Sequence, residues 1–167
     1  MPKKTPAAAQ NHQWLQSAWR AAEKSMHPSV RVGAVITTPD GSRILAAAAN
    51  NPPDGIRLIP ARLVPGEKSL WFMCAEKRAL ALAQRRLARF GLSSLKACRI
   101  YSTLMPCHTC AHDIIQAGLQ WVCVPAHATR RYPRLKKKYR RSMAAAEEMF
   151  IEKGIKLVAV PDCLPED

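Results

Sequence analysis

The sequence predicts an α/β domain in which one mixed β-sheet carries helices on its faces. Strand-like runs alternate with helical runs after an opening hairpin, and this alternation is typical of a sheet covered by helices. The length of 167 residues suits one domain that buries about two thirds of its unfolded surface. We therefore expect a single domain over residues 13–160, with a disordered basic tail at 1–12 and a short tail at 161–167.

The elements are expected in a regular order along the chain. They are a helix at 13–26, strands at 30–38 and 44–50, a loop at 50–72, a helix at 74–90, a strand at 98–104, a helix at 107–117, a strand at 119–126, a helix ending at 153 and a strand at 155–160.

In the first half of the chain, composition and turn residues define the elements. The Pro-, Lys- and Ala-rich start favours disorder. Apolar residues then recur with helical spacing until Pro28. Pro39-Asp40-Gly41 favours a tight turn between two apolar runs, which predicts a hairpin. The next stretch is dense in Pro and Gly, which favours a long loop, and loops of that length are usually functional.

In the second half, helix formers and glycines set the boundaries. The run after Cys74 is rich in Ala, Leu, Arg, Gln and Glu, and Gly91 ends it. Pro106 is suited to the first turn of the next helix, which Gly118 ends. Gly154 ends the last helix. The apolar runs between these helices are predicted to be strands.

Net charge and cysteine content limit the cellular compartment and the binding partners that we expect. The formal net charge of +14, concentrated at 84–89 and 129–141, suits nucleic acid or a phosphate-bearing small substrate, although a solvated basic helix face explains it equally well. We find no apolar run near the ~18 residues of a membrane span and no secretory signal, so we expect a cytoplasmic protein with reduced cysteines and no membrane association. Three of the six cysteines are interpreted as apolar filler: Cys98, Cys123 and Cys163.

The remaining cysteines form two motifs at predicted helix starts. Alone, Cys107 and Cys110 could be a redox pair, half of a structural zinc site or part of a catalytic one. Cys-Ala-Glu at Cys74, about thirty residues earlier, adds a third sulfur, and three thiolates without a fourth ligand describe an open zinc site. Helix N-termini favour thiolates there. Glu76 can then shuttle the proton of a zinc-bound water to a ring nitrogen and a departing amine, which is hydrolytic deamination.

These motifs resemble the zinc-dependent cytidine deaminase superfamily, whose signature is a ligand-Ala-Glu motif followed by Pro-Cys-x-x-Cys. Segments in order from His27 to Val160 resemble its deoxycytidylate deaminase branch. The resemblance implies a three-layer fold with a five-stranded mixed sheet, one catalytic zinc per chain and a homo-oligomer. It also implies a pyrimidine nucleotide or nucleoside as substrate, with dCMP the first candidate.

The sequence departs from that branch at the first ligand, which is normally His and is here Cys74. The third thiolate adds negative charge, so Lys77 and Arg78 are candidates to donate a hydrogen bond to a thiolate. The resemblance places Asn50 at the substrate sugar, although it is alternatively a turn residue before Pro52. Two further residues are expected near the substrate, one at a phosphate and one in the pocket wall: Arg31 and His108.

Two other functions remain open at this stage. The basic surface also suits a deaminase acting on cytosine or adenine in single-stranded DNA or RNA, with the base flipped into the pocket. A third hypothesis is a non-catalytic module that zinc only stabilises, but a structural zinc site would not need Glu76.

Overall fold

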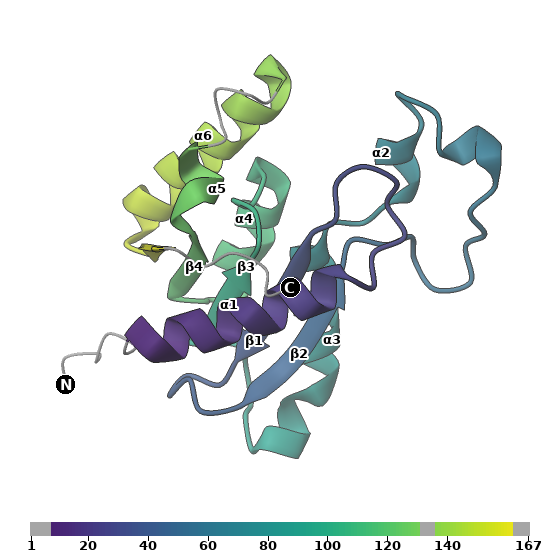
Figure 1. The fold of residues 1–167 in the computed structure, drawn as a ribbon. Helices are drawn as coiled ribbons and strands as arrows, with labels where there is room; N and C mark the ends of the chain where they lie inside the picture. Colours follow the sequence, from purple (N-terminus) through teal and green to yellow (C-terminus); the bar gives the residue numbers. More distant parts are fainter. Residues whose placement is uncertain (1–7, 131–135, 162–167) are drawn as a thin grey trace.

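The computed structural model describes residues 8–130 and 136–161. Its centre is a five-stranded mixed sheet in the order β2-β1-β3-β4-β5, which confirms the predicted fold class (Figure 1). The strands are β1 (Gly33–Thr37), β2 (Ile44–Ala49), β3 (Arg99–Ser102), β4 (Trp121–Pro125) and β5 (Lys156–Val160). The helices are α1 (Ala8–Ala22), α2 (Lys68–Trp71), α3 (Ala75–Arg86), α4 (His108–Gln116), α5 (Ala126–Arg130) and α6 (Lys137–Lys153), with 3-10 turns η1 (Pro60–Arg62) and η2 (Leu87–Phe90).

The strand directions decide where the helices begin. Strand β1 pairs antiparallel with both β2 and β3, whereas β3, β4 and β5 are parallel. Strands β2 and β3 therefore run in the same direction and end at the same edge of the sheet. The chain leaves this edge after β2 to reach α3 and after β3 to reach α4, so both helices can begin close together there.

The predicted hairpin is confirmed, and its turn is held by side chains. Asp40 accepts hydrogen bonds from the backbone N–H of Ser42 at 3.0 Å and from its hydroxyl at 2.8 Å, and also from the hydroxyl of Thr38. These bonds hold the pKa of Asp40 at about 2, below its usual range, with the Thr38 hydroxyl the largest cause. Gly41 has a φ of +73°, which suits glycine.

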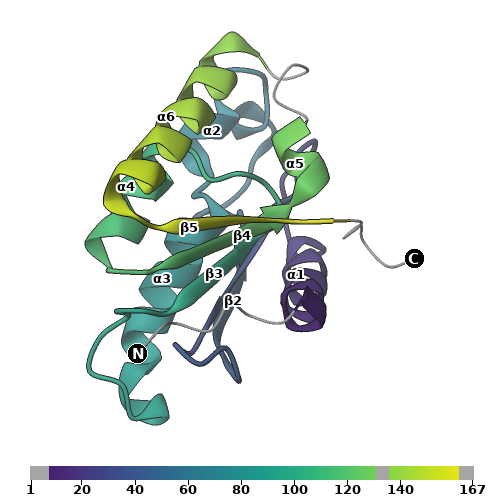
Figure 2. The same cartoon turned by 90° about the vertical axis from the view of Figure 1, so that its left-hand side faces the viewer.

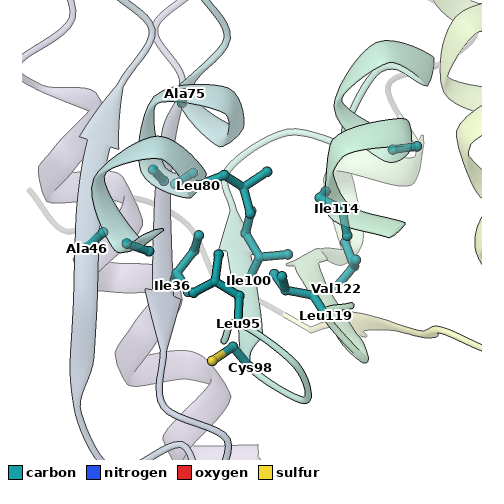
Figure 3. Packing of buried hydrophobic residues seen from close by; sticks show 14 of the residues in the cluster. Ile36, Ala46, Ala75, Leu80, Leu95, Cys98, Ile100, Ile114, Leu119 and Val122 are labelled. Atoms are coloured by element: carbon teal, nitrogen blue, oxygen red, sulfur yellow. The ribbon is translucent and has the colours of Figure 1, made fainter. Parts of the chain in front are cut away.

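Helices cover both faces of the sheet (Figure 2). On one face, α1 packs on Val35, Tyr101 and Cys123. On the other, α3, α4 and α6 pack on residues that alternate with these, including Ile36, Ile100 and Val122 (Figure 3). Burial of Cys123 and Cys98 confirms that they act as apolar filler, whereas Cys163 lies outside the described residues.

Helix α1 begins at Ala8, inside the segment predicted to be a disordered tail, so that boundary is wrong. The first turns of α1 are anchored by contacts with distant parts of the chain. The Tyr101 hydroxyl donates a hydrogen bond to the buried Asn11 side chain at 3.3 Å, and the indole N–H of Trp14 donates to the Gly41 carbonyl at 2.9 Å. Composition alone does not show such contacts. Residues 1–7 and 162–167 lie outside the described part.

Other predicted boundaries also change: α1 ends at Ala22 rather than at residue 26, and β1 covers only Gly33–Thr37. Helix α3 ends at Arg86 and continues as η2, which Gly91 closes with a φ of +66°. The long loop before α3 contains η1 and α2 and projects from the body of the domain (Figure 1). None of the helices in the described ranges is long and apolar enough to cross a membrane.

We expect Gly33→Ala to destabilise the domain, because helix α1 lies directly on β1 at this position. An added Cβ would lie 1.9 Å from the Ala18 carbonyl oxygen and 2.6 Å from the Ala22 nitrogen, both of them backbone atoms. The free energy of unfolding should fall by about 3 kcal/mol, at the upper end of the usual cost of overpacking. Urea denaturation measures this change.

The matched control is Ala47→Ser, which also adds one heavy atom, at an exposed position on β2 opposite Val35. This control should change the free energy of unfolding by less than about 0.5 kcal/mol. Equal urea midpoints for wild type and Gly33→Ala would show that α1 does not pack on β1 this closely.

Candidate metal centre

Three cysteine thiols meet where α3 and α4 begin. Cys74 is the residue before α3, Cys107 is the residue before α4, and Cys110 lies in the first turn of α4. Their sulfur atoms all lie within 4.8 Å of one another. The structure thus brings together the three cysteines singled out from the sequence, at two helix N-termini whose partial positive charge favours thiolates.

The spacing of these sulfurs fits a zinc ion. The Cys74 and Cys107 sulfurs are 4.0 Å apart, and the Cys107 and Cys110 sulfurs are 3.5 Å apart. Tetrahedral zinc with Zn–S bonds of about 2.3 Å requires sulfurs about 3.8 Å apart. Within residues 8–130 and 136–161, no further His, Cys, Asp or Glu joins this group. Three protein ligands with one position left over are typical of catalytic zinc rather than of structural zinc.

The charges of the thiols also favour a bound cation. The pKa of Cys107 lies below its usual range because of its hydrogen bonds with the thiols of Cys110 and then Cys74. The pKa of Cys110 is raised in turn, first by its bond to Cys107 and then by its bond to Cys74. Three thiolates this close repel one another, so all of them can be ionised together only around a positive ion.

Glu76 is the buried carboxyl group beside these sulfurs. It is the second residue of α3 and only 4% exposed. Its Oε1 accepts a hydrogen bond from the Ser102 hydroxyl at 2.9 Å, and its Oε2 lies 3.7 Å from the Cys110 sulfur. Burial raises its pKa to about 7, against a lowering by its own backbone N–H. A carboxyl with a pKa near neutrality can both accept and donate a proton in a reaction.

Lys77 and Arg78 make different contacts from those expected. The Lys77 ammonium donates to Asp113 Oδ2 at 2.6 Å and to the Thr109 carbonyl at 3.5 Å, and the described bonds of Arg78 go to the loop after β2. From α3, Lys77 reaches across to α4, and Arg78 reaches the Pro52 carbonyl at 2.7 Å. The expectation that one of them donates to a thiolate stays a prediction.

Lys77 still acts on the thiols through its charge. Burial alone would lower its pKa, but its hydrogen bond to Asp113, the charge of Asp113 and the charges of Cys110 and Cys74 together raise it. The ammonium is therefore held in its charged form between α3 and α4. This cation partly offsets the extra negative charge of a site with three thiolates.

Asn50 builds the loop beside the site. Its Oδ1 accepts hydrogen bonds from the Ser25 hydroxyl at 2.7 Å and the Val32 backbone at 2.8 Å, and its Nδ2 donates to the Val30 carbonyl at 2.9 Å. These bonds fix the segment between α1 and β1, so Asn50 is more than a turn residue. They use both lone pairs of Oδ1 and one of the two N–H groups. Its role at a sugar stays a prediction.

The remaining candidates lie on the surface. Arg31 is exposed in the segment that Asn50 fixes. His108 is also exposed, and its ring Nδ1 and backbone N–H both contact the Ser142 hydroxyl, at 2.7 and 3.1 Å. The ring of His108 is thus directed at α6. The substrate-binding roles of Arg31 and His108 stay predictions.

Sequence reasoning missed two residues of this site, Ser102 and Asp113. Asp113 lies one turn after Cys110 on α4 and pairs with Lys77. Ser102 had a detectable signal, since alternation along β3 places it on the same face as the core residue Ile100. A polar residue at an expected core position indicates a specific partner, and that partner is Glu76.

Comparison with known proteins identifies the family. Residues 8–126 match the family model described as the cytidine and deoxycytidylate deaminase zinc-binding region. The chain belongs to this family. It is therefore a zinc-binding deaminase of the hydrolase type, which confirms the family suggested by its motifs and excludes the non-catalytic module. The match ends at the start of α5, so α6 and β5 lie beyond it.

Individual relatives agree with this assignment. The chain is 29% identical over 152 residues to an uncharacterized deaminase in the luxG 3' region of Aliivibrio fischeri, covering 89% of this chain and 94% of that protein. It is 32% identical over 115 residues to the mouse deoxycytidylate deaminase, covering 65% of this chain and 60% of that protein. The fold is similar to that of the dCMP deaminase of cyanophage S-TIM5, with a TM-score of 0.67, 17% identity and coverage of 93% and 99% of the two chains.

We predict that Cys107→Ala abolishes zinc binding, because it removes a ligand that bridges the starts of α3 and α4. Wild-type protein should hold about one zinc per chain, and the variant should lose it during gel filtration. Elemental analysis of the eluted protein measures the zinc content. Cys98→Ala is the control, since this buried thiol lies in the apolar core and should leave the zinc content unchanged. A full equivalent of zinc in Cys107→Ala would mean that the ligand set is wrong.

Proposed function

We propose that this protein hydrolytically deaminates a cytosine-type nucleotide or nucleoside, with dCMP as the first candidate. The observation that carries the proposal is the buried Glu76 carboxyl beside Cys110, with its pKa near 7. A purely structural zinc site has no use for such a group. Support for the substrate class comes from the mouse deoxycytidylate deaminase and from the cyanophage dCMP deaminase, which has been solved in complex with dCMP and dUMP.

In the proposed mechanism, Cys74, Cys107 and Cys110 would hold zinc, which would act as a Lewis acid and activate a water molecule. Glu76 accepts the proton that the water loses and donates it to the ring nitrogen next to the reacting carbon. It then carries the second proton of the water to the amino group, which leaves as ammonia while the carbonyl forms. Because Glu76 is buried, its protons are exchanged with the substrate rather than with bulk solvent.

The loop beside the site is proposed to bind the rest of the substrate. Asn50 keeps one N–H group beyond its described bonds, and that group can donate to a sugar hydroxyl. Arg31 is exposed next to this loop and can pair with a phosphate. His108 is proposed to border the pocket from α4. The homo-oligomer implied by the family resemblance and dCMP as the first candidate substrate stay predictions.

Glu76→Gln is expected to abolish deamination while zinc stays bound. The amide cannot accept a proton, so turnover should fall by about 10²- to 10⁴-fold, whereas the three thiols remain in place. Ammonia release and the ultraviolet change should be followed with cytidine, deoxycytidine and their monophosphates, together with zinc content. Glu152→Gln makes the same chemical change at an exposed position on α6 and serves as the control. Full activity of Glu76→Gln would overturn the proton shuttle.

A second candidate function rests on the basic start of α6. Residues 136–141 are all exposed, and every one except Tyr139 is Lys or Arg. The contact between Ser142 and His108 fixes this segment against α4, next to the metal-binding cysteines. A cluster of this size exceeds what one nucleotide phosphate needs, so it favours a deaminase that acts on a base in single-stranded DNA or RNA.

Lys137→Glu/Lys138→Glu tests this second function. If the segment binds a nucleic acid backbone, the variant should bind a cytosine-containing single-stranded oligonucleotide more weakly. Its log-log salt slope should also be shallower, by about 0.7 for each lost phosphate contact. Lys153→Glu, at the opposite end of α6, is the control. Binding of the oligonucleotide at the wild-type level by Lys137→Glu/Lys138→Glu would show that this segment does not bind a nucleic acid backbone, and absence of oligonucleotide deamination by the wild type would overturn the second function.

A further inference from the structure

The catalytic carboxyl proposed above has a partner that lies outside the zinc-ligand motifs. The hydroxyl of Ser102, the last residue of β3, donates a hydrogen bond to Glu76 Oε1 at 2.9 Å. Ser102 is fully buried, and Glu76 is 4% exposed. A charge-assisted hydrogen bond between two buried groups is among the strongest non-covalent contacts of a side chain.

The position of Ser102 is fixed by the sheet rather than by a mobile loop. Ser102 pairs with Ala34 of β1. The next residue, Thr103, forms two bonds with Gly33: its backbone N–H donates to the Gly33 carbonyl at 3.0 Å, and its hydroxyl accepts the Gly33 N–H at 3.1 Å. These contacts hold the end of β3 against β1 at Ser102 and at the residue after it. The Ser102 hydroxyl therefore lies at one defined position relative to Glu76.

The two oxygens of Glu76 have contacts of different kinds. Oε1 is held by the hydroxyl from the sheet, whereas Oε2 lies beside the sulfur of Cys110 at 3.7 Å. A cysteine that binds a metal as thiolate has no proton left for a carboxylate. The hydroxyl of Ser102 does not depend on metal binding, so it continues to hold the carboxyl when the sulfur has become a ligand.

We propose that Ser102 is a positioning residue for the catalytic carboxyl: its hydroxyl fixes Oε1 of Glu76, so that Oε2 is the oxygen that exchanges protons during deamination. This inference rests on the proposed function of Glu76. It assigns a role to a buried serine on the core face of β3, where the other residue of that face, Ile100, is apolar. Without this partner, a buried hydroxyl would only destabilise the domain.

Ser102→Val and Ser102→Thr form a matched pair that tests the proposal. Thr and Val have nearly the same shape, but only Thr keeps the hydroxyl. Loss of a hydrogen bond to a charged group should lower kcat of Ser102→Val by about 10- to 100-fold, with KM within about threefold and zinc retained. Ser102→Thr should recover most of this loss. Ser102→Ala is a second variant without the hydroxyl, for use if the larger side chains prevent folding.

Thr37→Val is the control for removing a buried hydroxyl elsewhere in the sheet. Thr37 lies on β1, and its hydroxyl donates to the Thr38 carbonyl at 3.3 Å. This variant should keep wild-type kcat. Equal kcat for Ser102→Val and Ser102→Thr, or an equal loss in Thr37→Val, would overturn the positioning role.

A second measurement separates this proposal from the proposed function. The ¹³C resonance of the Glu76 carboxyl group, assigned by its loss in Glu76→Gln, reports directly on the hydrogen bond. It should shift in zinc-loaded Ser102→Val and stay near its wild-type position in Ser102→Thr. If the wild-type protein deaminates neither cytidine, deoxycytidine nor their monophosphates, the proposed function is wrong, whereas the resonance still tests the contact between Ser102 and Glu76. An unshifted resonance in Ser102→Val would mean that Ser102 does not hold Glu76.

Discussion

The site depends on one geometric constraint, the meeting of the first turns of α3 and α4 at a single edge of the sheet. Strands β2 and β3 are parallel to each other because both pair antiparallel with β1. The helices that follow them can therefore begin side by side and bring the sulfurs of Cys74, Cys107 and Cys110 within 4.8 Å. No single element could place three thiols and a carboxyl around one point. The metal centre is a property of the sheet topology.

Charge at this centre is balanced by contacts between the same two helices. Three thiolates and the Glu76 carboxyl concentrate negative charge in a partly buried region. Lys77 on α3 and Asp113 on α4 form an ion pair at 2.6 Å, which places a cation close to Cys74 and Cys110 and also joins the helices. The strongly basic surface of the protein lies elsewhere, at the start of α6. The domain therefore keeps a locally anionic metal centre beneath a cationic exterior, an arrangement that suits an anionic substrate.

The loops around the centre are held by buried polar side chains rather than by regular structure. Asn50 fixes the segment between α1 and β1 with three hydrogen bonds, and Arg78 fixes the chain after β2 through the Pro52 carbonyl. In addition to the substrate and thiolate contacts predicted for these residues, the structure gives them contacts that hold the neighbouring loops. Glu76 receives similar support from Ser102, which belongs to the sheet itself.

The sequence by itself determined the fold class, the order of the five strands and of the four longer helices, the three thiols and Glu76, because each of these depends on local pattern or on a short motif. Hydrophobic alternation, turn residues and the two helix-start motifs are all readable over a few residues. The tertiary structure alone decided the start of α1 at Ala8, the pairing of Lys77 with Asp113 and the contact between Ser102 and Glu76. Each of these joins segments that are distant in the chain, and their distance is set only when the strands pair and the helices pack on the sheet.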